Sequence, residues 1–354
     1  MKGLIYNYKL DYGGVSNFSL NFKEAAQNNI KVDIATSFNN RNEKDVIVLN
    51  NKNMYFELIK LLISKEYDFF LCEASITIFF LKLLSILKRK KIVFITVVHT
   101  RLDLLFKKRG FRGFLFKILV FMSMNFSDKI VCVSDGLLED LKKKKFIANK
   151  KLVRIYNPII QKIKNEGRVN IDIEKKFKIN LGIVGWIYDI KRQKDVVIAL
   201  DKLKNKKYNL KIIGGISDKS YYKKLENVIE KLNLTDQVEF LGILEDKKEI
   251  YRDLDILILS SESEALPTVI AEAMGYGIPV ISSDCDFGPN EILCNNKFGM
   301  LYEVGNIEQL ANAINIMCNN KIYNHYRKIS NDRVIDFTFD KCINEYLKVI
   351  KGNL

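Results

Sequence analysis

The stretch from Ser261 to Cys285 reads SESEALPTVIAEAMGYGIPVISSDC and contains a helical pattern followed by an apolar run. The residues before it, Asp253–Ser261, form another apolar run bounded by polar residues, which predicts a buried strand. We expect a helix from about Pro267 to Met274, because proline suits the first helical turn, where its missing N–H would have no partner in any case. A further strand should follow, so the stretch predicts a strand-helix-strand unit of an α/β fold.

The beginning of this predicted helix offers a place for a phosphorylated ligand. The backbone amides of Leu266, Thr268 and Val269 would have no partner within the helix, and the helix dipole is positive at that end. Both features suit a diphosphate. Glu264 and Glu272 flank the turn, and each carboxylate can accept hydrogen bonds from ribose or hexose hydroxyls. This combination predicts a site for a nucleotide sugar.

At these residues the chain resembles the retaining glycosyltransferases of family 4, which have the GT-B fold. The most specific part is the pair of glutamates separated by seven residues and followed by AMGYGIPVISSD (Ala273–Asp284), and the resemblance covers nearly the whole chain. It implies two Rossmann-like domains facing each other across a cleft. It also implies that Glu264 holds the sugar hydroxyls of a donor and Glu272 its ribose hydroxyls. The alternative is a pair of acids that only complements the helix dipole.

The length and the pattern of the chain agree with two α/β domains. A chain of 354 residues exceeds what one core usually supports. Apolar strand candidates alternate with amphipathic stretches in both halves, which predicts parallel sheets covered by helices. The candidates are residues 3–8, 32–36, 68–73, 91–99 and 128–134 in the first half, and 179–186, 209–215, 238–242, 255–261, 278–284 and 299–303 in the second.

The boundary between the two domains is expected near residues 158–178, which are polar and show little periodicity. By the resemblance, residues 1–165 form an N-terminal acceptor-binding domain and residues 166–335 a C-terminal domain that binds the nucleotide sugar. In the family the last helix packs back on the N-terminal domain. We assign that helix to the segment 336–354, which contains the apolar-periodic run Phe339–Ile350.

Two residues of the first half enter the site through the resemblance. Gly14 lies in the loop DYGGVSNF (Asp11–Phe18), where the family places a glycine pair against the donor diphosphate and the acceptor. His99 ends the strand candidate 91–99, at the sheet edge where open α/β sheets bind ligands. Similar enzymes carry a histidine there that contacts the donor sugar or its phosphate. A glycine turn and a lone histidine are also compatible with purely structural roles.

A basic loop supplies the remaining candidates. Family members usually show G-R-x-x-x-x-K after the first strand of the second domain, and the two cations neutralise the departing diphosphate. Here Trp186 replaces the arginine, Lys191 is retained and Arg192 follows it. The resemblance implies catalytic roles for His99, Lys191 and Glu264, and donor binding by Gly14, Arg192, Leu266, Pro267, Thr268, Val269 and Glu272.

The implied reaction moves a hexose or N-acetylhexosamine from a UDP-sugar to a hydroxyl of a glycan or polyprenyl-diphosphate-linked acceptor, with retention, in surface polysaccharide biosynthesis. The segment SDCDFGPNEIL (Ser283–Leu293) resembles a subset of the family that uses UDP-sugars. An epimerase of the same fold is an alternative. No cofactor or metal is expected, because the six cysteines lack C-x-x-C spacing and no D-x-D arrangement in the cleft elements has a claim to bind Mn²⁺ or Mg²⁺. GGVSN also lacks the G-x-G-x-x-G pattern of a dehydrogenase.

The net charge of +15 favours an anionic partner. Basic residues interleave with aromatic and aliphatic ones over residues 104–121, which is typical of a segment in a membrane interface. The same apolar positions could instead pack into the core. Further basic runs are Lys88–Lys91 and Lys142–Lys145.

Without a nucleic-acid motif, we expect no nucleic-acid partner. With no signal peptide and no spanning segment read, we expect a cytoplasmic protein with peripheral contact at the inner face of the plasma membrane.

Overall fold

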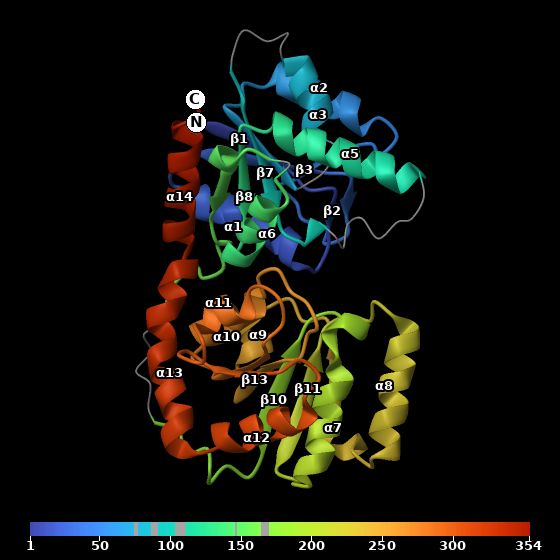
Figure 1. The fold of residues 1–354 in the computed structure, drawn as a ribbon, viewed down its shortest axis with the longest axis vertical. Helices are drawn as coiled ribbons and strands as arrows, with labels where there is room; N and C mark the ends of the chain where they lie inside the picture. Colours follow the sequence, from blue (N-terminus) through green and yellow to red (C-terminus); the bar gives the residue numbers. More distant parts are fainter. Residues whose placement is uncertain (74–76, 86–90, 103–110, 146, 164–169) are drawn as a thin grey trace. The chain divides into compact units, whose positions relative to one another are not determined.

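The computed structural model describes residues 1–354 except 74–76, 86–90, 103–110, 146 and 164–169. The chain forms two compact units (Figure 1). One comprises Met1–Gln161 and Asp336–Leu354, and the other comprises Lys162–Ile335. Each unit contains a parallel sheet with helices on both faces, which confirms the predicted α/β class.

The sheet of the first unit has the strand order β5-β3-β1-β6-β7-β8-β9. All of its neighbouring strands pair in parallel. The strands are β1 (Lys2–Tyr6), β3 (Lys31–Thr36), β5 (Ile47–Val48), β6 (Phe69–Glu73), β7 (Val93–Val98), β8 (Lys129–Cys132) and β9 (Leu152–Arg154), and a separate short pair is formed by β2 (Lys9–Leu10) and β4 (Phe38–Asn39). The order reverses between β1 and β6, and open α/β sheets bind ligands at the carboxyl edge of such a switch point.

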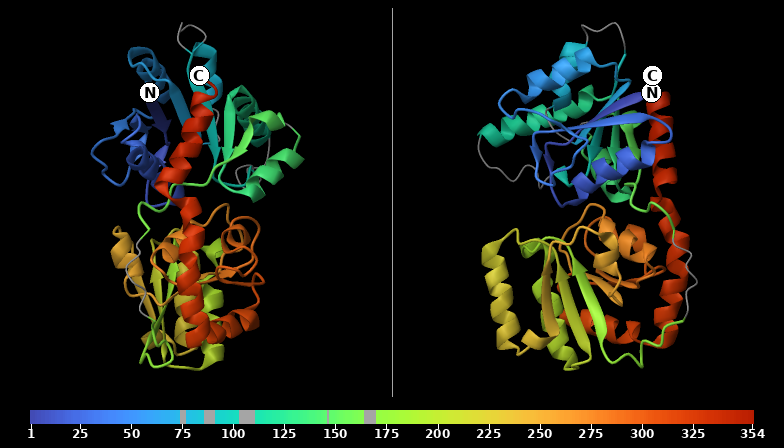
Figure 2. Two further views of the ribbon diagram at one scale, coloured as in Figure 1. Left: turned by 90° about the vertical axis from the view of Figure 1, so that its left-hand side faces the viewer. Right: turned by 180° about the vertical axis from the view of Figure 1, so that it is seen from behind.

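Helices cover both faces of this sheet (Figures 1 and 2). Residues of α2 and α3 pack on one face, in a core that includes Leu4, Phe70 and Phe94. On the other face, Phe22 of α1 packs against Phe69 of β6 and Tyr346 of α14. The helices are α1 (Gly14–Ala26), α2 (Met54–Ser64), α3 (Thr77–Ser85), α5 (Phe111–Phe126), α6 (Asp135–Lys143) and α14 (Phe339–Lys351), with 3-10 turns at η1 (Asn149–Lys151) and η4 (Ile335–Phe337).

The second unit repeats this plan with the strand order β12-β11-β10-β13-β14-β15. Its switch point lies between β10 and β13, because β11 pairs on one side of β10 and β13 on the other. The strands are β10 (Ile179–Val184), β11 (Tyr208–Ile213), β12 (Val238–Gly242), β13 (Ile256–Leu259), β14 (Val280–Ser283) and β15 (Met300–Tyr302). Every strand predicted from the sequence is therefore present, since each strand candidate overlaps one of these strands or one of β1, β3, β6, β7 and β8.

The helices of the second unit bury the apolar faces of its sheet (Figure 1). Its main core joins α7, α8 and α12 to the sheet through residues such as Leu200, Leu225 and Ile314. The helices are α7 (Gln193–Leu203), α8 (Lys219–Lys231), α9 (Lys247–Tyr251), α10 (Thr268–Gly275), α11 (Pro289–Leu293), α12 (Ile307–Met317) and α13 (Asn320–Val334), with 3-10 turns at η2 (Asp189–Lys191) and η3 (Thr235–Gln237).

The predicted start of the helix after β13 needs a correction. The helix α10 begins at Thr268, and Pro267 is its extended N-cap residue, with φ −72° and ψ 95°. Pro267 contributes a carbonyl to the helix, because the amide of Ile270 donates to it at 3.1 Å. The proline therefore caps the helix from outside and does not form its first residue.

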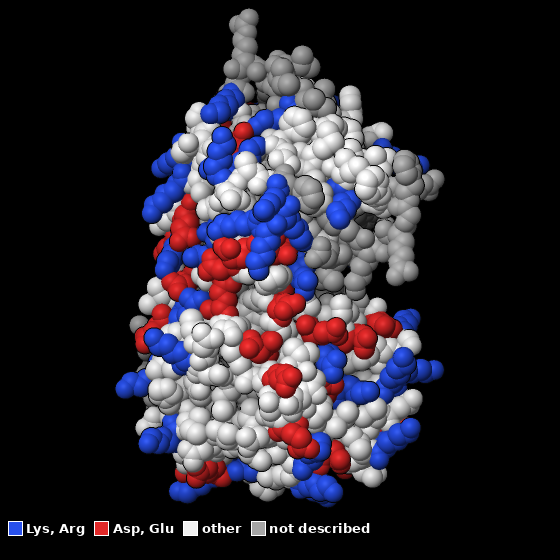
Figure 3. All heavy atoms as spheres, in the orientation of Figure 1, with Lys and Arg blue, Asp and Glu red and all other residues white. Residues whose placement is uncertain are grey.

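The surface of α5 exposes large apolar side chains. Phe114 is 61% exposed and Leu115 47%, and Phe116, Ile118, Met122 and Phe126 are each exposed as well. Over residues 113–126 of the helix, where burial is described, the buried residues are Val120, Ser123 and Met124, which form a narrow face. Figure 3 shows mainly uncharged side chains in this region, with lysine and arginine residues scattered near it. Of the basic-aromatic stretch, residues 104–110 lie outside the described residues, as do 88–90 of the first basic run.

Within the described segments, no helix combines the length and the apolar character that crossing a bilayer requires.

Candidate active site

Two loops meet at the switch point of the second unit. Lys191 ends η2 in the loop after β10, and Glu264 lies in the loop after β13. The Nζ atom of Lys191 is 2.6 Å from Oε1 of Glu264. Ser261 Oγ donates to the same carboxylate oxygen at 2.6 Å, and Ser260 Oγ donates to the Lys191 carbonyl at 2.7 Å. Two residues that the sequence analysis gave to different parts of a ligand are therefore directly paired.

The Lys191–Glu264 pair is shielded from water. The two side chains are only 21% and 13% exposed. Burial alone would lower the pKa of Lys191, but attraction to Glu264 and the hydrogen bond outweigh it and raise the pKa. Lys191 is therefore a cation at neutral pH. Such a cation in a partly dry site can stabilise negative charge that develops on a leaving group.

The backbone around Lys191 is held by glycine contacts. Gly185 and Gly214 both have φ +147°, and a Cβ atom on Gly214 would lie 2.1 Å from the carbonyl oxygen of Gly185. Glycine is therefore required for this close approach of the ends of β10 and β11. Trp186 packs its ring over Gly215, and its carbonyl accepts a hydrogen bond from Gln193 Nε2 at 3.0 Å. In the place of a family arginine, Trp186 supports the loop and carries no charge.

Arg192 contacts acids other than Glu264. It has a left-handed backbone, with φ 50° and ψ 37°, and it caps α7. Its Nε atom donates to Asp195 at 2.7 Å, and its Nη1 atom is 4.0 Å from Glu262. The hydrogen bond to Asp195 is the main cause that raises the pKa of Arg192. A donor contact for this partly exposed guanidinium stays a prediction.

The first turn of α10 carries the predicted amides. Leu266 and Pro267 are buried, whereas Thr268 and Val269 are partly exposed. No backbone carbonyl in the described part of the chain accepts from the amides of Thr268 and Val269, as expected for the first two residues of a helix. Gly288, with φ +77°, brings the next loop against this turn, because a Cβ atom there would lie 2.5 Å from Cδ of Pro267.

Glu272 is held by two residues that the sequence analysis missed. Its Oε2 atom accepts a hydrogen bond from the Tyr251 hydroxyl at 2.8 Å, and its Oε1 atom is 3.1 Å from Lys247 Nζ. Burial, followed by the nearby charge of Glu272, raises the pKa of Tyr251 well above its ordinary value, so its hydroxyl remains a donor. Lys247 and Tyr251 are four residues apart on α9, a spacing that puts them on one helix face. Nothing in the sequence connects that face to α10.

The other two predicted site residues belong to the first unit. Gly14 is the exposed first residue of α1, and a Cβ atom there would meet no atom within 4 Å. The His99 ring, directly after β7, lies against Phe18 of α1, with the ring centroids 4.7 Å apart. Its Nε2 atom is shielded and has no hydrogen-bond partner among the described residues. Burial lowers the pKa of His99 to about 3, so the imidazole is neutral at physiological pH.

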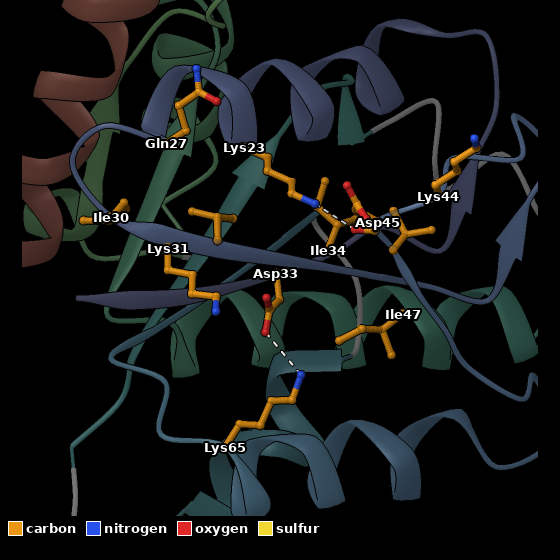
Figure 4. A pocket seen from close by; sticks show the side chains of 12 residues that line it. Lys23, Gln27, Ile30, Lys31, Asp33, Ile34, Lys44, Asp45, Ile47 and Lys65 are labelled. Carbon is orange, nitrogen blue, oxygen red and sulfur yellow. Dashed lines mark hydrogen bonds and ion pairs between the residues drawn. The ribbon is translucent and has the colours of Figure 1, made fainter.

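Other polar features of the described residues lie apart from these candidates. No group of three or more His, Cys, Asp or Glu side chains within the described ranges is arranged to hold a metal ion. A pocket of about 640 Å³ in the first unit lies along β3 (Figure 4). Among its charged side chains, Lys65 is 3.4 Å from Asp33, and Lys23 donates to the carbonyl of Asp45 at 2.7 Å. It contains none of the predicted site residues.

The chain is similar to known glycosyltransferases over most of its length. The family model described as Glycosyltransferase Family 4 matches residues 12–160, and the model described as Glycosyl transferases group 1 matches residues 166–333. An uncharacterized glycosyltransferase of Haemophilus influenzae is 27% identical over 65% of this chain and 63% of its own length. The match therefore spans less than two thirds of that relative.

A second relative and a solved structure extend the likeness. The N-acetylgalactosamine-N,N'-diacetylbacillosaminyl-diphospho-undecaprenol 4-alpha-N-acetylgalactosaminyltransferase of Campylobacter jejuni is 24% identical over 71% of this chain and 67% of its own. The Anabaena protein HepE, solved with UDP and glucose, superimposes with a TM-score of 0.80 at 17% identity, over 99% of this chain and 100% of that one. At such identity this likeness bears on the fold alone. The two family models together show that the chain belongs to glycosyltransferase family 4, and this likeness with the two parallel sheets shows that it has the GT-B fold.

Proposed function

We propose that this chain transfers a hexose or N-acetylhexosamine from a UDP-sugar to a hydroxyl of a glycan or lipid-linked acceptor, with retention and without a metal ion. The observation that carries the proposal is the ion pair at the switch point between Lys191, in the loop after β10, and Glu264, in the loop that leads into α10. A cation, a carboxylate and unpaired amides are what a diphosphate and its attached sugar need. The printed name of the Campylobacter relative describes transfer to an undecaprenyl-linked glycan, which supports an acceptor of that kind here.

The proposed roles follow from the chemistry of each group. The diphosphate binds at the first turn of α10, and Lys191 stabilises the charge that it gains on leaving. Glu264 holds hydroxyls of the sugar, and Glu272 accepts a hydrogen bond from the ribose. The acceptor hydroxyl attacks on the face from which the diphosphate departs, and its proton passes to the departing phosphate oxygen. For His99 and Gly14, contact with the donor stays a prediction from the family resemblance.

A donor screen tests the proposal. Purified protein is heated with UDP-, GDP-, ADP- and dTDP-hexoses, and we expect UDP-sugars to raise Tm most, because a ligand that binds only the folded state stabilises it. Product analysis with the same sugars should then yield a glycoside with a retained anomeric configuration. A free epimerised nucleotide sugar would indicate the epimerase instead, and protection by none of the nucleotides would contradict a nucleotide-sugar site.

Glu272→Gln is expected to raise the KM for the donor about tenfold, with kcat changed by less than threefold. The amide still accepts a hydrogen bond from Tyr251, but its bond to the ribose loses the charge that makes such bonds stronger, about 1.5 kcal/mol or more. Initial rates at varied donor concentration measure the effect. Glu249→Gln, at an exposed position of α9, is the matched control. A donor KM equal to that of the wild type would remove the ribose role.

Metal independence is part of the proposal, because Lys191 and the amides of α10 supply the positive charge that a divalent ion gives other transferases. Turnover should be unchanged after treatment with EDTA. Loss of turnover that Mn²⁺ or Mg²⁺ restores would contradict it.

The apolar surface of α5 supports peripheral binding to an anionic membrane, where a lipid-linked acceptor is presented. Phe114, Phe116 and Ile118 are exposed around Lys117, so apolar side chains can enter the headgroup region while the lysine meets anionic lipid. Figure 3 shows further lysine and arginine residues in this unit. The net charge of +15 adds attraction to such a surface.

Vesicle flotation measures this membrane contact. With phosphatidylglycerol vesicles at low salt, the wild type is expected to float, and the Phe114→Ser/Ile118→Ser variant should float several-fold less. The matched control is Phe177→Ser, which removes an aromatic side chain that is 91% exposed in the second unit. A wild-type protein that stays entirely in the soluble fraction would contradict the membrane proposal.

A further inference from the structure

Glu272 is held in the same manner as Glu264, the other carboxylate of the candidate site. Glu264 accepts a hydrogen bond from a serine hydroxyl and pairs with Lys191. Glu272 accepts a hydrogen bond from the Tyr251 hydroxyl and pairs with Lys247. Each acid therefore presents an acceptor oxygen directly beside an ammonium group. The proposed reaction uses the ammonium group of Lys191 and leaves that of Lys247 without a role.

The two oxygens of Glu272 lie in different surroundings. Oε2 accepts from Tyr251, which is 1% exposed and stacks on Tyr276 with the ring centroids 5.2 Å apart. Oε1 lies 3.1 Å from Nζ of Lys247, a side chain that is 35% exposed. The buried tyrosine therefore fixes one side of the carboxylate, and the side that faces Lys247 is the more open one.

Lys247 keeps hydrogen-bonding capacity beyond this ion pair. Among the described residues, Glu272 is its only ion-pair or side-chain hydrogen-bond partner. An ammonium group has three N–H donors and no acceptor, and a carboxylate has only acceptors, whereas a hydroxyl both donates and accepts. Two neighbouring hydroxyls are therefore the chemical complement of an acceptor and a donor that stand 3.1 Å apart.

We propose that Lys247 is a donor-binding residue that makes the site specific for ribose over deoxyribose. Oε1 of Glu272 accepts a hydrogen bond from one hydroxyl of the ribose, and Nζ of Lys247 donates to the oxygen of the other. This role rests on the proposed nucleotide-sugar site and deepens it, because it assigns the second contact of the ribose. No covalent bond changes at either residue.

The arrangement predicts a preference for an intact diol. A site built to hydrogen-bond a hydroxyl rejects an analogue that lacks it, because the polar groups of the site then lose a partner. Since the Lys247 side chain is partly exposed, water replaces part of the lost contact. We therefore expect discrimination at the lower end for a charged hydrogen bond, about tenfold in Kd.

The structural alternative is that the ion pair only ties α9 to α10. In that case, removal of Lys247 would disturb Glu272 in the same way for every nucleotide, whichever hydroxyls the nucleotide carries. A ribose contact instead makes the effect of the substitution depend on one particular hydroxyl. Ligands that differ by a single hydroxyl therefore separate the two roles.

A cycle of one substitution and two deoxy nucleotides tests the proposal. Calorimetric titration gives the Kd of UDP, 2′-deoxy-UDP and 3′-deoxy-UDP for the wild type and for Lys247→Met. The wild type should bind each deoxy nucleotide about tenfold more weakly than UDP. Lys247→Met should bind UDP about tenfold more weakly than the wild type does, yet bind one of the deoxy nucleotides as tightly as the wild type, within twofold. Two losses that remove the same hydrogen bond do not add.

The matched control is Lys248→Met, at the exposed neighbouring position of α9, which should match the wild type for all three nucleotides. An equal loss for UDP and both deoxy nucleotides in Lys247→Met would leave only the tie between the helices and overturn the proposal. Unchanged binding of all three would also overturn it.

The wild type alone supplies a further comparison that needs no variant. Equal affinity for UDP and both deoxy nucleotides would remove the role of Lys247 and leave the nucleotide-sugar site standing. A wild type that binds none of the three would contradict the proposed nucleotide-sugar site itself, and this role with it. The two failures are therefore distinguishable.

Discussion

Replacing Lys191 with alanine is expected to lower kcat about 100-fold or more, with a much smaller effect on the KM for the donor. The ammonium group is held 2.6 Å from Glu264 and is charged at neutral pH, so it can meet the negative charge that a diphosphate gains on leaving. Removing one such preorganised donor from an active site costs about 100- to 1,000-fold in kcat. Steady-state rates at saturating donor and acceptor measure the loss.

The control for this variant is Lys194→Ala, which removes an exposed lysine three residues further along the chain. It should keep kcat within twofold. Lys191→Ala also leaves the carboxylate of Glu264 without its cationic partner, so we expect a loss of about 1–3 kcal/mol in the free energy of unfolding, measured by urea denaturation. A folded Lys191→Ala protein that keeps more than a tenth of the wild-type kcat would show that the lysine does not stabilise the leaving group.

Glu264→Gln is expected to reduce kcat/KM about 100-fold. The amide can still accept the hydrogen bond from Ser261, but the ion pair with Lys191 and the charged contact to the sugar are both lost. Attraction to Glu264 is what raises the pKa of Lys191 against the effect of burial. Without it the pKa of Lys191 should fall, so activity of the variant should decline at a lower pH on the alkaline side than activity of the wild type.

The matched control is Glu262→Gln, because this side chain is 62% exposed and lies 4.0 Å from Arg192. This variant should have little effect on kcat/KM or on the pH at which activity declines on the alkaline side. If Lys191 and Glu264 act as one unit, the double variant Lys191→Ala/Glu264→Gln should be hardly less active than the worse single variant. Losses that multiply fully in the double variant would contradict their coupling.

The strands of both sheets were predictable because buried parallel strands are nearly continuous apolar runs. The runs 91–99 and 255–261 each contain a strand, β7 and β13, whose residues are all buried. The exceptions are short strands such as β9, which has three residues and no fully buried side chain. The start of α10 was displaced by one residue, because a proline can both begin a helix and cap it.

The candidate site was predictable in its residues and less so in its contacts. The resemblance named Lys191 and Glu264, but their ion pair depends on β10 and β13 being neighbours, which requires the strand order of the sheet. Tyr251 and Lys247 belong to no sequence motif, and they contact Glu272 because α9 packs beside α10 in the folded chain.

The basic-aromatic stretch shows the same limit. The sequence left two interpretations of its apolar positions open, because a periodic apolar pattern indicates a helix face without showing what covers it. In the described part of α5, Phe114 and Leu115 are exposed, so these side chains do not pack into the core.

The central claim is that the first turn of α10 and Lys191 grip a diphosphate, and a crystal structure of the protein with UDP tests it most directly. The account predicts β-phosphate oxygens about 3 Å from the amides of Thr268 and Val269 and from Lys191 Nζ, with Glu272 hydrogen-bonded to the ribose. UDP bound at another place, with those amides and Lys191 out of reach of its phosphates, would contradict the account.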